Sequence, residues 1–198
     1  MPLITTNNDQ HSSAISIQQF SKSLTAQMIG PDGKLRADGL RQLCLDAGAD
    51  DVGFVRLDNP RLADQRDDIL AAFPNTHSLI SIVRRMNRTN IRSPHRSVAN
   101  VEFHHTGDDI EQSARMIARK LESIDIEAAY PAMGFPMEMD RYPGKIWSVS
   151  HKPVAEAAGL GVIGLHRNVI HPKFGNFILL GTVVVDREIS SYGAFLDE

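Results

Sequence analysis

Six residues that include three glycines, 159–164 (GLGVIG), constrain the fold of this chain more than any other stretch. They match the pattern G-x-G-x-x-G of dinucleotide-binding folds, and Asp186 follows at the spacing of the ribose-binding acid, roughly 20 residues. Such a site needs a strand before the first glycine and a helix after the third, because the pyrophosphate binds at that helix's N-terminus. Here residues 150–158 predict a helix that Ser150 can cap and that Gly159 ends in a left-handed conformation. The order is reversed, so the sequence argues against a nicotinamide site.

The rest of the chain alternates helical and extended patterns, which predicts an α/β (α+β) fold with a mixed central sheet flanked by helices. Hydrophobic periodicity predicts helices at 14–28, 35–47, 63–73 and 110–124, and strands at 51–57, 78–83, 126–132 and 177–185. Thr106 and Asp109 form a capping-box pattern that predicts the start of the fourth helix. Residues 97–105 are either a bent extension of that helix or a separate turn. Residues 134–145 predict a long irregular loop of the kind that is often functional.

Length and charge bound the class of protein. The 198 residues, 42% of them hydrophobic, predict a disordered polar tail at 1–12 followed by one domain over 13–198 that folds without disulfides. A net charge of −3 and a pI near 6.2 argue against a broad nucleic-acid surface. No long apolar run or leader pattern is present, so the expected location is cytoplasmic, without membrane contact.

Few single residues in the sequence indicate a catalytic or binding site on their own. Cys44 is the one cysteine and falls on an apolar helix face, so we expect a buried, inert thiol. The eight histidines form no metal-ligand pattern, and we expect no metal site. The basic stretch from Arg84 to Arg96 favours a solvated loop over a phosphate site. Trp147, the single tryptophan, is expected to pack in the core at the edge of the long loop.

Five blocks carry a resemblance that is more specific than these patterns. They are 148–164 (SVSHKPVAEAAGLGVIG), 168–176 (NVIHPKFGN), 180–186 (LGTVVVD), 48–54 (GADDVGF) and 73–80 (FPNTHSLI). Together they resemble the core of the epoxyqueuosine reductase and reductive dehalogenase superfamily. There a helix leads into A-G-L-G-x-x-G, a segment ends near P-x-x-G, and a strand ends in Asp.

The resemblance implies a nitroreductase-like domain that binds cobalamin with its lower axial nucleotide displaced. In that superfamily a ferredoxin-like module with two 4Fe-4S clusters follows and delivers electrons to cobalt. This chain ends about where the first cluster-binding cysteines would be expected, so we expect the cobalamin-binding domain without its electron-donating module, inactive alone. The implied substrate is a small molecule or a modified nucleoside, and the uncovered docking face makes a homodimer possible.

The catalytic residues that the resemblance suggests are Tyr142 and Lys145. Epoxyqueuosine reductases carry an aspartate proton donor before the block helix, and Lys145 stands at the matching position. Tyr142 and Lys145 resemble the tyrosine and the basic residue that protonate the product in dehalogenases, and a nearby lysine stabilises phenolate.

A corrin ring is a large plate edged with amides, which needs close backbone approach, hydrogen-bonding groups and an apolar floor. The candidates are glycines for the approach, polar side chains for hydrogen bonds and apolar side chains for the floor. They are Gly159, Gly161, Gly164 and Gly175; Ser148, Ser150, His151 and Asn168; and Val162, Ile163 and Phe174. The alternative is that the glycines only end a helix and shape turns.

Two other function classes stay open at this point. One is a cobalamin-binding or trafficking module without redox chemistry. The other is a flavin-dependent nitroreductase-like enzyme, in which the basic stretch from Arg84 to Arg96 would hold the flavin phosphate.

Overall fold

A four-stranded antiparallel sheet forms the centre of the molecule in the computed structural model, which describes residues 23–134 and 147–194. Its strands are β1 (Asp51–Arg56), β2 (Ser78–Arg85), β6 (Ile178–Val185) and β3 (Ala128–Ala129), in the order β1-β2-β6-β3. The expected combination of helices and a central sheet is confirmed. The expected mixed sheet is wrong, because each of the three strand pairings described is antiparallel.

The strand sequences explain why this sheet is covered on both faces. All but the last two residues of β2 are buried, and β6 is buried along nearly its whole length. Ile80 and Ile82 belong to the core cluster under one face, while Leu79 and Val83 belong to clusters under the other. A strand that is apolar on both sides must lie between two layers.

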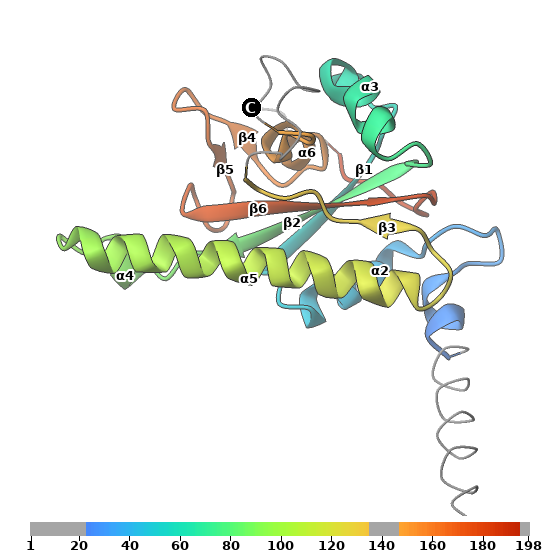
Figure 1. Cartoon of the computed structure of the whole chain (residues 1–198), viewed down its shortest axis with the longest axis horizontal. Coiled ribbons are helices and arrows are strands. Elements are labelled where there is room, and N and C mark those ends of the chain that lie inside the picture. The colour runs from blue at the N-terminus through green and yellow to red at the C-terminus, as the bar shows by residue number, and fades with distance from the viewer. Residues whose placement is uncertain (1–22, 135–146, 195–198) are drawn as a thin grey trace, which may run out of the picture.

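Helices supply those two layers (Figure 1). On one face lie α2 (Ala37–Asp46) and α5 (Arg96–Glu122), and Figure 1 shows α5 running along the sheet. On the other face lie η1 (Pro60–Leu62), α3 (Ala63–Ala72) and α6 (His151–Ala157). The short α4 (Arg88–Ile91) joins β2 to α5, and β4 (Val162–Ile163) pairs with β5 (Val169–Ile170) in a separate ribbon. No helix among residues 23–134 and 147–194 is long and apolar enough to span a membrane.

Helix α5 corrects one prediction and decides another. The helix begins at Arg96, so residues 97–105 are helical and Thr106 does not cap anything. The Thr106 hydroxyl instead donates to the carbonyl oxygen of Glu102 at 2.8 Å, within the helix. A threonine inside a helix can form this bond to the preceding turn, so the capping-box pattern alone did not locate the helix start.

Other boundaries differ more modestly. Strand β3 covers only residues 128–129 of the predicted 126–132. Ser150 does occupy the N-cap position of α6, but its side chain makes no capping bond there. Residues 23–28 are helical, as predicted, whereas the predicted tail at 1–12 and the start of the first helix lie outside the described residues.

Gly159 ends α6 with a φ of 78°, as the sequence predicts. A Cβ at this position would overlap the carbonyl oxygen of Ala194, and a Cβ at Gly53 or Gly193 would overlap that of Ala158. These glycines therefore let the end of α6 pack directly against β1 and against the segment at 193–194. For Gly159 the helix-ending role is the alternative to cofactor contact that the sequence left open.

We expect Gly159→Ala to lower the free energy of unfolding by at least about 2 kcal/mol, measured by urea denaturation. The matched control is Gly33→Ala, since Gly33 has a φ of 76° but open space around the Cβ position. Gly33→Ala should lower the free energy of unfolding only through the strain of the left-handed backbone, by about 1 kcal/mol. Equal losses in the two variants would show that the contact with Ala194 does not constrain the end of α6.

Candidate functional site

A cavity of about 580 Å³ lies between α5, β6 and the start of α6, and three of the predicted cofactor residues line it. They are Ser150, His151 and Asn168. Ser150 and His151 reach the cavity because they form the first turn of α6, and Asn168 because it directly precedes β5. The sequence prediction therefore brings part of its residue set to one place.

The floor and walls of this cavity are mostly apolar. Strand β6 begins there with Ile178, Leu179 and Leu180. Helix α5 adds Phe103 and Gly107, and the chain on either side of 135–146 adds Met133 and Trp147. Phe103 and Trp147 are 47% and 40% exposed, so both present a broad ring surface to the opening.

Trp147 is thus not the core residue that the sequence suggested. Its indole Nε1 donates to the carbonyl oxygen of Met133 at 2.7 Å, which holds the ring at the edge of the cavity. An indole ring that has one face exposed to water and a hydrogen-bonded nitrogen is typical of binding surfaces.

Polar side chains with free hydrogen-bonding capacity surround this apolar floor. Among the described residues, neither the Ser150 hydroxyl nor the Asn176 amide has a partner, and Asn168 uses only its oxygen, which accepts from Lys152 at 2.9 Å. Lys152 also donates to the carbonyl oxygen of Arg167, so two oxygens of this chain hold its ammonium group. The rim therefore offers donors and acceptors, and it also carries the exposed charges of Lys152, Asp108 and Glu111.

His151 is the most constrained polar group at the cavity. It is only 9% exposed, and its Nδ1 lies 2.8 Å from the Thr182 hydroxyl. Its Nε2 lies 3.5 Å from the carbonyl oxygen of Ala132, and a carbonyl only accepts, so Nε2 carries the proton and Nδ1 accepts from Thr182. Burial lowers the pKa of His151 to about 4, an effect that the Ala132 carbonyl opposes only in part. The imidazole is neutral at pH 7 and both its nitrogens are engaged.

The other predicted cofactor residues lie elsewhere. Gly159 ends α6, and Ser148 lies three residues before it begins. Gly161, Val162, Ile163 and Gly164 form the β4 side of the ribbon, where a Cβ at Gly161 would overlap the Ile170 carbonyl oxygen. Phe174 and Gly175 lie in the turn after β5. None of these eight residues lines the cavity.

The predicted catalytic residues Tyr142 and Lys145 lie outside the described residues. Gly134 and Trp147, on either side of that segment, both line the cavity. Sequence reasoning missed Phe103 and Gly107, whose position on α5 could be read only once the helix was known to start at Arg96.

Metal-binding side chains do not cluster in the described part of the chain, where no group of three His, Cys, Asp or Glu residues could hold an ion. Cys44 is fully buried, and burial raises the pKa of its thiol well above its usual range. A thiol kept protonated in an apolar core does not ligate iron, because the thiolate is the ligand.

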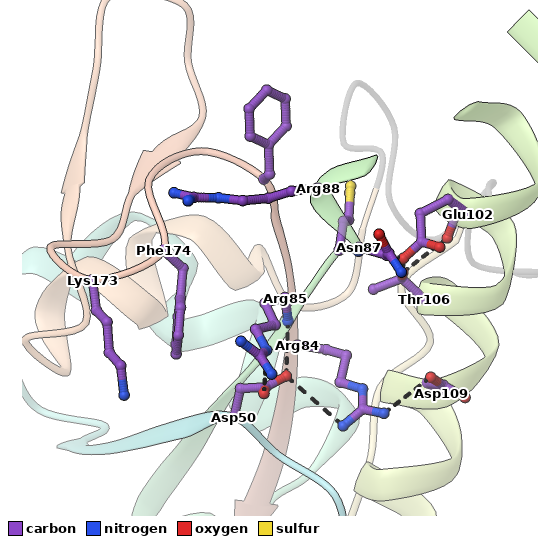
Figure 2. Close-up of a pocket in the computed structure, with 12 residues that line it drawn as sticks. Asp50, Arg84, Arg85, Asn87, Arg88, Glu102, Thr106, Asp109, Lys173 and Phe174 are labelled. Carbon is purple, nitrogen blue, oxygen red and sulfur yellow. Dashed lines mark hydrogen bonds and ion pairs between the residues drawn. The ribbon is translucent and has the colours of Figure 1, made fainter. Parts of the chain in front are cut away.

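The basic stretch also differs from prediction, since it is not one solvated loop. Arg84 and Arg85 end β2, Arg88 begins α4 and Arg96 begins α5. Arg84, Arg85 and Arg88 line a second groove of about 630 Å³, which also contains Phe174 (Figure 2).

The neutral state of His151 makes stability pH-dependent. Because the folded-state pKa of about 4 lies below the usual 6.5, the unfolded chain binds the proton first, and stability falls as the pH drops from 6.5 towards 4. We expect this residue to contribute about 2 kcal/mol to the stability difference between pH 7 and pH 5. Urea denaturation at both pH values should show that the free energy of unfolding of His151→Gln changes by about 2 kcal/mol less between pH 7 and pH 5 than that of the wild type. The control His166→Gln, at an exposed position, should keep the wild-type dependence, and an unchanged dependence in His151→Gln would contradict the assignment.

Comparisons with known proteins give a likeness of fold. No family model matches the sequence, and no curated protein matches it. Among solved structures, an epoxyqueuosine reductase in complex with an epoxyqueuosine-modified tRNA-Tyr stem loop matches with a TM-score of 0.56 and 16% identity over 81% of this chain. The epoxyqueuosine reductase from Streptococcus thermophilus matches with a TM-score of 0.55 and 17% identity over 80% of this chain. The catabolic reductive dehalogenase NpRdhA matches with a TM-score of 0.63 and 15% identity over 93% of this chain.

The chain spans about half the length of these epoxyqueuosine reductases, 48%, and about a quarter of the dehalogenase, 27%. The resemblance to this superfamily that the sequence suggested is therefore confirmed in structure. This chain has the fold of a part of epoxyqueuosine reductases and reductive dehalogenases.

Proposed function

We propose that this chain is the cobalamin-binding domain of a corrinoid reductase similar to epoxyqueuosine reductase. The observation that carries the proposal is the apolar cavity between α5, β6 and α6, in a fold similar to those of two reductase classes. One of the matching structures is that of a reductive dehalogenase whose dehalogenation is B12-dependent.

The residues at the cavity fit part of a corrin. The ring is an apolar plate with an amide edge, and the cavity offers the apolar surface of 178–180 with partner-free groups of Ser150 and Asn176 at its rim. The charged side chains that line the cavity, those of Lys152, Asp108 and Glu111, are exposed, and the buried His151 is neutral, so the apolar floor carries no charge. A volume of about 580 Å³ accommodates only part of the cofactor, and the rest must extend past the opening.

Bound cobalamin would supply a reduced cobalt centre that attacks or reduces the substrate. The role of this chain is to bind and orient the plate and to exclude water from its buried side. His151 cannot ligate cobalt through either nitrogen in the observed arrangement, since Thr182 and Ala132 hold both.

Electrons would come from 4Fe-4S clusters held outside this chain, because Cys44 is its single cysteine and is buried. Tyr142 and Lys145 stay the predicted proton-donating pair. The substrate that we propose is a small molecule or a modified nucleoside, the latter because one matching enzyme was solved with a modified tRNA stem loop.

Titration of the purified chain with cob(II)alamin tests the cofactor directly. We expect the absorption spectrum of the base-off form, together with quenching of tryptophan fluorescence. Trp147 is the single tryptophan and lines the cavity, so the quenching reports binding at this place. An unchanged cobalamin spectrum, combined with quenching of tryptophan fluorescence on adding FMN, would contradict the proposal and favour a flavin at this cavity.

Gly107 offers a matched pair of variants that locates the binding. It lies in α5 at the cavity, and a Cβ there would make only ordinary contacts of 3.7 Å with Met133 and 4.0 Å with Leu179. Gly107→Ala should keep cobalamin binding and stabilise the helix by up to about 1 kcal/mol. Gly107→Phe should fill the cavity and weaken cobalamin binding at least tenfold. Wild-type affinity in Gly107→Phe would place the cofactor elsewhere.

A further inference from the structure

The groove of about 630 Å³ at the end of β2 takes no part in the proposed corrin site. Its side chains come from β2, from the start of α4, from α5 and from the turn after β5 (Figure 2). Four cationic and three acidic side chains line it: Arg84, Arg85, Arg88 and Lys173; Asp50, Glu102 and Asp109.

The acidic groups are already committed to partners within the groove. Asp50 accepts from Arg85 Nε at 3.0 Å and lies 3.8 Å from Arg84 Nη1. Arg84 also bonds Asp109 at 3.2 Å. Glu102 accepts the backbone N–H of Asn87 at 2.6 Å. Figure 2 shows these contacts as dashed lines, one set joining the Asp50, Arg84, Arg85 and Asp109 side chains and another at Glu102 and Asn87.

The positive charge that remains has no partner. Among the described residues, the side chains of Arg88 and Lys173 make no ion pair or hydrogen bond, and the bonded side-chain nitrogen of Arg85 is Nε, which leaves both Nη groups free. Both Arg88 and Lys173 are exposed at the rim. Unpaired guanidinium and ammonium groups that face one groove form a site for an anion, and the guanidinium fork suits a phosphate.

An aromatic ring lies beside these cations. Lys173 Nζ is 5.2 Å and the Arg85 guanidinium carbon 5.9 Å from the centre of the Phe174 ring, which stands between the two side chains in Figure 2. Phe177 lines the groove as well. Flat apolar surfaces next to cations suit a ligand that carries both a phosphate and an aromatic ring.

The position of Phe174 is fixed from beneath by a buried histidine. His171 stacks on the Phe174 ring at 4.6 Å, and its Nδ1 accepts the backbone N–H groups of Lys173 and Phe174 at 3.1 and 3.3 Å. Its Nε2 donates to Asp51 at 3.1 Å, which ties the turn to β1. The aromatic wall is therefore held in place before any ligand arrives, which lowers the entropy cost of binding.

We propose that this groove binds a mononucleotide, that is, a phosphate monoester of a nucleoside whose base is a flat aromatic ring. The volume is that of a small-molecule pocket. The net charge of −3 disfavours a long polyanion. The inference is independent of the corrin proposal, because the two sites have different lining residues apart from Met86.

Calorimetric titration of the cofactor-free full chain with AMP, adenosine and inorganic phosphate tests the proposal. AMP should bind at least tenfold more tightly than adenosine or phosphate. The double variant Arg88→Gln/Lys173→Gln should weaken AMP binding about tenfold or more. Phe174→Leu should lower the affinity for AMP towards that of inorganic phosphate. The control Arg66→Gln, exposed on α3 and outside the groove, should bind AMP as the wild type does.

Three results would overturn the proposal. They are equal affinities for AMP and inorganic phosphate, wild-type AMP binding by the double variant, and tighter binding of a single-stranded oligonucleotide than of AMP. Thermal unfolding checks that the double variant is folded, which is expected because both side chains are exposed. Cob(II)alamin titration of the same variant should match the wild type, so a failure here stays separate from a failure of the corrin proposal.

Discussion

The antiparallel pairing of β2 with β6 is the constraint on which the rest of the structure depends. The two strands pair along eight residues, from Ser78 with Val185 to Arg85 with Ile178. Both are apolar on both faces, so neither can exist without the helices above and below. The pairing therefore fixes α5 on one face and α6 on the other, and each of these helices contributes to the candidate site.

The same pairing explains why the cavity and the groove are neighbours. The strands are antiparallel, so the end of β2 meets the start of β6, and Arg84 lies opposite Leu179. Residues 178–180 form the apolar floor of the cavity, while Arg84 and Arg85 line the groove. Met86, which follows directly, lines both. One end of one strand pair thus supplies an apolar surface and a charged one.

The sequence predicted those features that depend on local patterns. The runs at 78–83 and 177–185 predicted the two central strands, because long β-branched and apolar stretches have few other stable states. Gly159 as a helix end followed from its neighbours. The residues that bind the cofactor were predicted less well. In a sequence, a glycine that lets a ligand approach the backbone closely looks the same as one that lets another chain segment approach it. Gly161 packs against the carbonyl oxygen of Ile170, and only the tertiary fold shows this. The role of Thr106 likewise depends on whether the helix has already begun.

The charge arrangement keeps the two sites chemically distinct. An unpaired arginine beside an apolar cavity would lower its affinity for a neutral plate and would favour water there. Arg84 avoids this by pairing with Asp50 and Asp109, and the unpaired cations Arg88 and Lys173 lie at the exposed rim of the other groove. On the cavity side, His151 stays neutral because Thr182 and the Ala132 carbonyl satisfy it without charge. Two ligand chemistries can then coexist within one small domain, because each charge is either paired or exposed to solvent.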